Sequence, residues 1–202
     1  KTKRVLKGGY KSMQNKPDIS FPLLGWHPTG EYLTVMREKK GKVWMDYQKK
    51  KKRKYEKNKF FYFDKVLDFF FFFYGQEIVL SGIQKGQSDI FVYNTRSRSS
   101  TNLTDDFYDD LQPSFSTDSK NIIFISNRVN DSLGVDKSDK LPPNNNFDVF
   151  VMNYSANSPL LKRITNTPLA NEKYPIAADS GRYYFLCDAS GIYNRYVAAL
   201  DS

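Results

Sequence analysis

Four aspartates lie within six residues, at Asp105, Asp106, Asp109 and Asp110. Carboxylate oxygens are the ligands that calcium prefers, so this cluster is a candidate cation site. The spacing differs, however, from the D-x-D-x-D-G pattern of a calcium-binding loop. The cluster is therefore interpreted as an acidic connecting loop, and no metal is predicted.

Candidates for catalysis are few, because the sequence has a single His, His27, and a single Cys, Cys187. This excludes a disulfide framework and a multi-cysteine zinc site. His27 lies among turn-forming residues, and Cys187 lies in a strand-like run, where a buried and unreactive thiol is expected. No G-x-S-x-G, P-loop, G-x-G-x-x-G or H-E-x-x-H motif occurs. The sequence therefore predicts no catalytic residues and no cofactor, and the chain is expected not to be an enzyme.

The net charge of +9 is concentrated in one segment, because residues 49–59 carry eight cations and one anion. Such a run can attract phosphate groups or anionic lipids. The candidate polyanion-binding residues are Lys49, Lys50, Lys51, Lys52, Arg53 and Lys54. A solvated loop explains the same run and is favoured. Nucleic acid is therefore not expected as a partner, and membrane contact is expected only through this run or through a partner.

No segment has the pattern of a leader or a membrane span. Residues 1–16 lack an apolar stretch followed by a cleavage site, so no signal peptide is predicted in this chain. The longest apolar run, FFFFFY at 69–74, is far shorter than the ~20 residues that a membrane helix needs. It has the flanks of a buried strand. Five successive Phe indicate either a strand covered on both faces or an unusual local sequence.

A repeat is visible in the turn-like segments. Four segments share an apolar or small residue, three further residues and then a Gly or Ser, at positions 30, 75, 119 and 181. The intervals are 45, 44 and 62 residues, and the last contains a polar insertion of 18 residues at 129–146. Without this insertion the last interval is also 44 residues. The period is therefore regular.

Each unit continues with strand-like segments in the same order. The first follows the turn, at 32–36, 78–81, 122–126 and 183–186. The next includes the nearly identical hexapeptides DIFVYN at 89–94 and DVFVMN at 148–153. In the two middle units, an edge-type segment containing Leu-Thr or Ile-Thr follows. The pattern predicts an all-β protein, a β-propeller of four-stranded antiparallel blades with about four blades in this chain.

The third unit carries a family resemblance. Residues 112–128, QPSFSTDSKNIIFISNR, closely resemble the P-x-F-S-P-D-G-K-x-I-x-F-x-S-x-R repeat of TolB-like β-propellers. The same repeat occurs in the propellers of prolyl-oligopeptidase-type peptidases and tricorn-like proteases. The other units keep parts of it, and the resemblance spans about residues 20–201. The chain also resembles large TolB-like envelope proteins of Bacteroidota, which implies a periplasmic or outer-membrane-associated location.

The repeat predicts one propeller segment with five parts. Residues 1–19 supply a strand of a preceding blade, 20–59 form a blade with a basic loop at 48–59, 60–107 form a blade, 108–170 form a blade with the insertion at 129–146, and 171–202 form a partial blade. An open arc of blades leaves faces and edges exposed. The chain is therefore predicted to be part of a larger propeller.

Resemblance to TolB implies that a partner docks at the channel mouth, where loops enter the innermost strands. The candidate partner-binding residues there are Tyr108, Asp109, Asp110, Gln112, Glu172, Lys173 and Tyr174. Such polar residues suit protein recognition better than a small apolar ligand. The leading hypothesis is a non-enzymatic scaffold that binds protein in a bacterial cell-envelope assembly. The alternatives are the substrate-gating propeller of a serine peptidase whose catalytic domain is absent from this chain, and a polyanion binder acting through the basic run.

Overall fold

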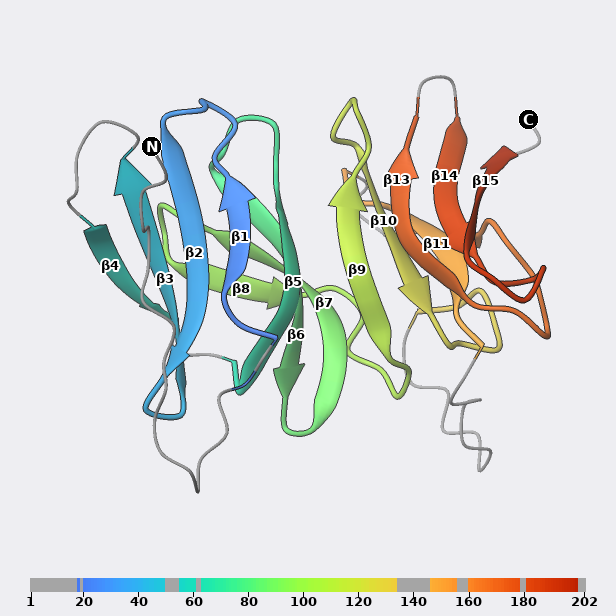
Figure 1. Ribbon diagram of the computed structural model, residues 1–202, viewed down its shortest axis with the longest axis horizontal. Coiled ribbons are helices and arrows are strands. Elements are labelled where there is room, and N and C mark those ends of the chain that lie inside the picture. The colour runs from blue at the N-terminus through green and yellow to red at the C-terminus, as the bar shows by residue number, and fades with distance from the viewer. Residues whose placement is uncertain are drawn as a thin grey trace.

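The computed structural model describes residues 18, 20–49, 63–133, 146–155, 160–178 and 181–199, together with the backbone of residues 55–60. Every regular element in these residues is a β-strand, and antiparallel strands form four separate sheets (Figure 1). Among the described residues, no helix is long and apolar enough to cross a membrane. The predicted all-β class is confirmed.

The four sheets follow one another along the chain as four blades. Blade 1 contains β1 (Leu23–Trp26), β2 (Tyr32–Lys39), β3 (Lys42–Lys49) and β4 (Tyr55–Phe60). Blade 2 contains β5 (Lys65–Phe71), β6 (Glu77–Gln84), β7 (Gln87–Asn94) and β8 (Ser99–Asn102). Blade 3 contains β9 (Asp110–Phe115), β10 (Asn121–Ser126), β11 (Asp148–Asn153) and β12 (Leu161–Arg163), and the described part of blade 4 contains β13 (Glu172–Ala177), β14 (Arg182–Cys187) and β15 (Asn194–Ala199). Within each blade, every strand pairs with the next one along the chain.

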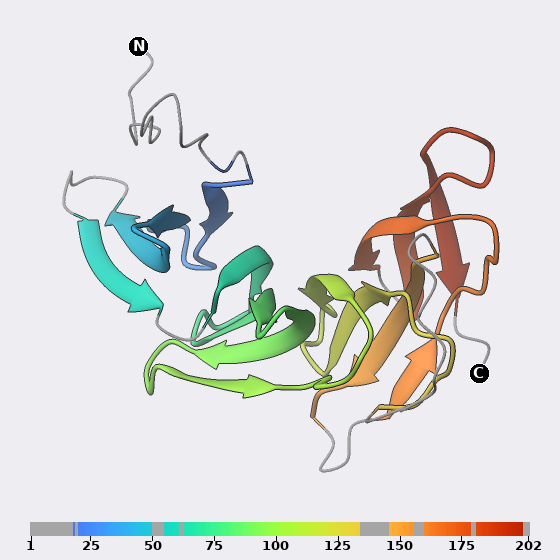
Figure 2. The ribbon, with the colours of Figure 1, turned by 90° about the horizontal axis from the view of Figure 1, so that it is seen from below.

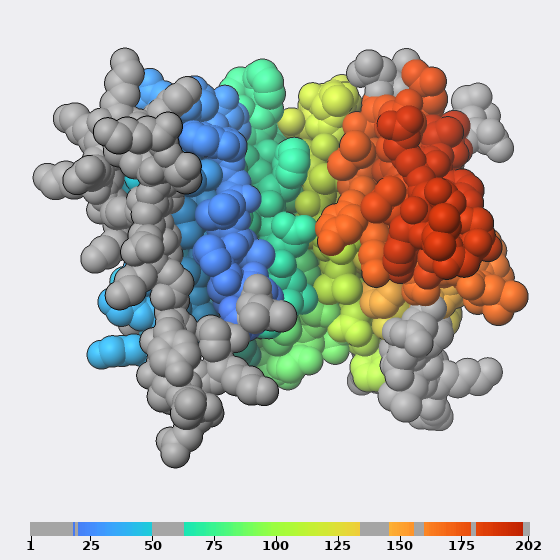
Figure 3. Space-filling model, in the orientation of Figure 1, coloured from blue at the N-terminus to red at the C-terminus, as the bar shows by residue number. Residues whose placement is uncertain are grey.

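The blades form an arc with their first strands on the inside. β1, β5, β9 and β13 lie side by side on the concave side of this arc (Figure 2). Figure 3 shows the concave side, with β9 recessed between blades 2 and 4. This arrangement of four consecutive antiparallel blades is the predicted propeller architecture.

Apolar layers fill the spaces between neighbouring blades. The layer between blades 1 and 2 includes Met36, Met45, Phe69 and Phe91. The layer between blades 2 and 3 includes Val79, Ile90, Phe124 and Phe150. The layer between blades 3 and 4 includes Ile123, Val151, Tyr183 and Phe185. Because each sheet is a single layer with two apolar faces, it becomes stable only when neighbours cover both faces.

The run of five Phe is explained by where its strand ends. Phe69 and Phe71 are buried in the layer facing blade 1, whereas Phe70 between them is 48% exposed. β5 ends at Phe71, and Phe73 lies exposed in the following turn. The strand therefore alternates as a half-covered strand should, and the rest of the run belongs to the turn.

The four repeat positions share one backbone conformation. Gly30, Gly75, Ser119 and Gly181 have φ values of 67°, 70°, 58° and 71°. In the first three, the N–H closes the turn by donating to the carbonyl three residues earlier, at 2.8 Å. Positive φ is easy for Gly and costly for residues with a Cβ. The period found in the sequence thus marks the residue that each turn needs in the left-handed region.

The predicted basic loop at 48–59 is wrong at both ends. β3 continues through Lys49, and β4 begins at Tyr55 and pairs with β3 from Gln48 to Val43. Cationic side chains are well tolerated on an edge strand, where they also discourage pairing with other chains. Residues 50–54 lie outside the described residues, as do 134–145 of the insertion and the segment 1–17 expected to supply a strand. The basic run at 49–59 therefore starts at the last residue of β3 and ends within β4, and blade 1 extends to Phe60.

Two glycines with the same φ offer a matched test of the contact between blades 1 and 2. A Cβ at Gly30 would meet no atom within 4 Å, whereas a Cβ at Gly75 would overlap the ring of His27. We expect Gly30→Ala to lower the free energy of unfolding by about 1 kcal/mol through backbone strain alone. Gly75→Ala also forces the His27 ring to move and should lower it by more than Gly30→Ala does, by about 2 kcal/mol. Urea unfolding measures both losses, and equal losses would contradict the packing of His27 against blade 2.

Candidate functional site

The predicted mouth loops lie at one end of the blades. In blade 3, Asp110, Ser126 and Asp148 pair in a row across β9, β10 and β11, so the start of β9 lies beside the end of β10. In blade 4 the corresponding row begins at Glu172. We call this the mouth end; it is the lower end in Figure 1. The loops here include residues 103–109, residues 164–171 and the hairpin at 188–193.

A buried ion-pair cluster holds the mouth end of blade 3. The side chain of Arg128 is fully buried, donates to both carboxylate oxygens of Asp110 at 2.9 and 2.8 Å, and lies 3.1 Å from Asp106. Its other donors reach the Ser126 hydroxyl at 2.9 Å and the Ser132 carbonyl at 3.0 Å. Three rings lie within cation–π distance of the guanidinium: Tyr108 at 5.4 Å, Phe124 at 5.8 Å and Phe150 at 5.6 Å.

Asp89 completes a group of three buried carboxyl groups with Asp106 and Asp110, whose oxygens lie within 4.8 Å of one another. Burial raises the pKa of Asp110 to about 7, although the charge of Arg128 opposes this rise. Burial also raises the pKa of Asp89 and of Asp106. Carboxylates this close repel one another, so the site needs a compensating positive charge. Arg128 supplies it, and the arrangement is a structural ion-pair cluster between blades 2 and 3.

A recurring hydrogen-bond clamp holds the fourth strand of blades 2 and 3. The Thr104 hydroxyl donates to Asp89 at 3.2 Å, and the Thr165 hydroxyl donates to Asp148 at 3.2 Å. Each hydroxyl also accepts the N–H of the residue after its aspartate, at 3.1 and 2.8 Å. The repeated Asp and the repeated Leu-Thr or Ile-Thr are therefore the two halves of one clamp.

Blade 4 carries a different acid at the position of Asp110. Glu172 begins β13, and its side chain is buried. The Thr167 hydroxyl oxygen lies 2.6 Å from its Oε1, within hydrogen-bond distance, whereas Oε2 has no hydrogen-bond partner within the described residues. Burial raises the pKa of Glu172 to about 7, and the nearby charge of Asp148 adds to this rise. The thiol of Cys187 faces the same carboxyl group and is buried, as predicted.

The innermost strands of blades 3 and 4 bulge near the mouth end. Gln112 and Tyr174 each precede a Pro and have φ values of 53° and 52°, and the register of β9 and β13 shifts at these positions. The side-chain oxygen of Gln112 accepts the N–H of Tyr174 at 2.6 Å. Non-glycine residues keep positive φ only where the surrounding structure holds them. This link between the blades fixes the exposed Tyr174 on the concave side.

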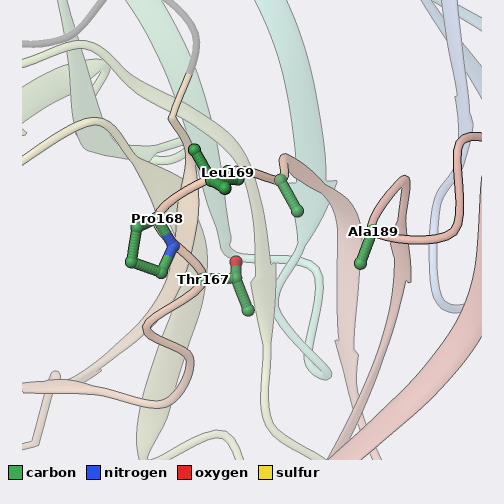
Figure 4. Close-up of a pocket in the computed structure, with 5 residues that line it drawn as sticks. Thr167, Pro168, Leu169 and Ala189 are labelled. Atoms are coloured by element: carbon green, nitrogen blue, oxygen red, sulfur yellow. The ribbon is translucent and has the colours of Figure 1, made fainter.

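Four exposed apolar side chains, which we call the apolar tips, lie on the mouth-end loops. They are Phe107, Leu169, Ile192 and Tyr193. A small pocket separates the loop before β13 from the hairpin before β15, and Leu169 lies at its rim (Figure 4). The residues that line it are Thr167, Pro168, Leu169, Ala170 and Ala189.

The structure divides the predicted mouth residues into two groups. Tyr108, Asp110 and Glu172 are buried, so the prediction that they contact a partner directly is corrected. They face inward because their partners lie inside the protein. Arg128 binds the Asp110 carboxylate and packs against the Tyr108 ring, and Thr167 contacts the Glu172 carboxyl group. The remaining predicted residues are exposed or half-buried: Asp109, Gln112, Lys173 and Tyr174.

Of the predicted polyanion site, only Lys49 lies within the described residues. Its side chain is exposed, 3.9 Å from Glu31 and 5.4 Å from the ring centre of Tyr32. The other five residues, Lys50 to Lys54 with Arg53 among them, lie outside the described part of the chain. Polyanion binding through this run stays a prediction.

Sequence reasoning missed Arg128 and the apolar tips. The cluster of Asp105, Asp106, Asp109 and Asp110 suggested one shared site, but Asp105 and Asp109 are exposed and the other two turn inward. Arg128 lies 18 residues from Asp110, and no local pattern reveals a pair at that distance. Single apolar residues within polar loops, such as Leu169, were the available signal for the tips.

Removal of Arg128 should have a pH-dependent effect on stability. We expect Arg128→Ala to lower the free energy of unfolding by about 3–5 kcal/mol at pH 8, because it leaves buried carboxylates without a partner. These carboxyl groups have raised pKa values, so they take up protons at pH 5 and the loss there should be smaller.

Urea unfolding of the Arg128 variant at both pH values measures this difference. Arg163→Ala is the matched control, since Arg163 also pairs with a buried aspartate, Asp148, at 3.1 Å but is 15% exposed. Its loss should be smaller and less dependent on pH. Equal losses at pH 5 and pH 8 for Arg128→Ala would contradict the assignment of its partners.

Comparison with known proteins places the fold. No family model and no curated protein matches this sequence. Among solved structures, TolB from Acinetobacter baumannii matches with a TM-score of 0.63 at 15% identity, over 87% of this chain and 40% of that chain. A putative TolB from Agrobacterium tumefaciens matches with a TM-score of 0.62 at 16% identity, over 90% of this chain and 62% of that chain.

A prolyl endopeptidase structure also matches, with a TM-score of 0.58 at 10% identity, over 87% of this chain and 26% of that chain. The chain thus spans less than two thirds of the two TolB chains and about a quarter of the peptidase. At these identities the likeness concerns the fold. The chain has the fold of a TolB-like β-propeller, as the repeat at 112–128 predicts.

Proposed function

We propose that this chain is a non-enzymatic, protein-binding part of a β-propeller and that its partner docks at the mouth end. The observation that carries this proposal is that four exposed apolar side chains, the apolar tips Phe107, Leu169, Ile192 and Tyr193, lie on loops at that end. Aromatic and large aliphatic side chains contribute most of the energy of protein interfaces.

Polar groups around the tips support recognition of a protein. Asp109 is exposed beside Phe107, and the Lys173 ammonium lies 4.3 Å from the ring centre of Tyr193. An apolar centre with a polar rim is the usual composition of a protein interface. The pocket beside Leu169 is small and open, which suits one side chain of a partner better than a whole ligand.

The bases of the loops are held in place. Tyr108 donates its N–H to Asp106 at 3.0 Å and accepts a hydrogen bond from Gln87 at 2.7 Å, which ties the loop of Phe107 to blade 2. Asn171 donates its N–H to Asp188 at 2.7 Å, which ties the loop of Leu169 to the next hairpin. Contact residues on fixed supports lose less entropy when they bind. The tips are thus presented on an ordered frame.

A bacterial envelope assembly is the proposed setting. Its support is the TolB-like repeat at 112–128 and the two TolB structures with the same fold. A substrate-gating propeller of a serine peptidase is the second candidate, because a prolyl endopeptidase also contains this fold. The coding sequence on both sides of this chain distinguishes them, since the peptidase requires an α/β-hydrolase domain.

The docking site can be tested with variants at the two ends of the blades. Leu169→Asp and Ile192→Asp place charges among the apolar tips and should weaken capture of the partner at least about tenfold. Phe73→Asp is the matched control, because Phe73 is about as exposed as Ile192 but lies in a turn at the opposite end. The readout is the amount of one reproducibly identified protein captured from bacterial envelope extract.

Loss of that protein with the mouth-end variants alone is the expected result. Loss with Phe73→Asp alone, or unchanged capture with all three variants, would contradict the proposed docking site. Circular dichroism of each variant checks that the blades are folded.

A further inference from the structure

Thr167, which lines the pocket, contacts two acidic side chains, those of Glu172 and Asp148. The Thr167 hydroxyl oxygen lies 2.6 Å from Glu172 Oε1 and 3.3 Å from Asp148 Oδ1. The side chains of both acids are buried. One hydroxyl group therefore lies between two carboxyl groups that have little access to water.

The number of protons on these three side chains decides which of them can donate a hydrogen bond. A hydroxyl group has one proton to donate, and an ionised carboxylate can only accept. If both acids were ionised, Thr167 could donate to one of them and would face lone pairs of the other at close range. A proton on Glu172 removes this conflict, because Glu172 can then donate to Thr167 while Thr167 donates to Asp148.

The two acids differ in the partners that surround them. Asp148 is compensated: Arg163 donates to its Oδ2 at 3.1 Å, and its Oδ1 accepts from the Thr165 hydroxyl at 3.2 Å and the Thr167 N–H at 3.0 Å. Glu172 faces Asp148 of β11, Cys187 of β14 and Thr167, and within the described residues no cation contacts it. The proton therefore belongs on Glu172.

In blade 3 a cation, and not a proton, can balance the corresponding acid. Asp110 begins β9 as Glu172 begins β13, and it binds the Arg128 guanidinium through both oxygens. Blade 3 thus balances its buried acid with a cation. Blade 4 has no such cation among the described residues. Burial raises the pKa of Glu172 to about 7, and it raises that of Asp110 to about 7 against the opposing charge of Arg128.

The loop at 164–171 forms the rim of the pocket. Thr167 holds it at one end through its N–H bond to Asp148, and the Ala170 N–H donates to the Thr167 carbonyl at 3.1 Å. Leu169 between them is fully exposed. Thr167 is therefore the point at which the protonation of Glu172 can act on the apolar tips.

We propose that Glu172 is a proton-operated latch, which holds the loop at 164–171 when protonated and releases it when ionised. As a regulator of docking, this latch rests on the proposed function, but its protonation and the loop motion are properties of the chain alone. The folded pKa lies above the value of 4.5 for a free Glu. The latch therefore contributes its full stability below about pH 4.5 and loses it as the pH rises toward 7.

The test combines a carboxyl titration with amide exchange on the chain. In a ¹³C NMR titration, the Glu172 carboxyl should change protonation with a midpoint near 7. Hydrogen exchange at Thr167 and Ala170, corrected for its intrinsic pH dependence, should be at least about tenfold faster at pH 8.5 than at pH 5.5. A midpoint near 4.5 would overturn the proposal.

Two variants sharpen the result. Glu172→Gln keeps a donor for Thr167 but cannot titrate, so exchange in the loop should be slow and independent of pH. Glu31→Gln is the matched control at an exposed site in another blade, and it should keep the response of the unchanged chain. A Glu172→Gln chain with that same response would also overturn the latch. Neither readout involves a partner, so failure here is distinct from failure of the docking proposal.

Discussion

Each blade has two apolar faces, and only another blade can cover them. Every other feature of the structure depends on this constraint. The three apolar layers alternate with the four sheets, so that Phe124 and Phe150 of one blade cover Val79 and Ile90 of the blade before it. Because a sheet of this size cannot bury enough surface alone, the blades stabilise one another in series. The first strands are thereby brought side by side on the concave side.

The same stacking creates a difficulty at the mouth end, where polar residues begin the innermost strands. Asp110 and Glu172 enter the space between blades and lose their contact with water. A buried carboxyl group needs either a cation or a proton. Blade 3 supplies Arg128, and we infer that blade 4 uses a proton on Glu172. One position in the repeat thus has two chemical solutions.

The sequence predicted the parts of the fold that repeat. Positions 30, 75, 119 and 181 all have positive φ, because each turn imposes the same backbone requirement. The matching hexapeptides at 89–94 and 148–153 lie in β7 and β11, the third strands of blades 2 and 3. β4 was missed because its lysines suggested a loop, although an edge strand accepts them. The inward position of Asp110 and Glu172 was also missed, since it depends on partners in distant segments rather than on nearby residues.

The central claim is that partner recognition occurs at the mouth end, on loops supported by the buried acids. Its most direct test is a hydrogen-exchange footprint of the chain with a purified partner bound. The account predicts slower exchange at residues 103–109, 164–171 and 188–193, with little change elsewhere. Protection confined to the turns at 27–31, 72–76 and 116–120, at the opposite end of the blades, would contradict it.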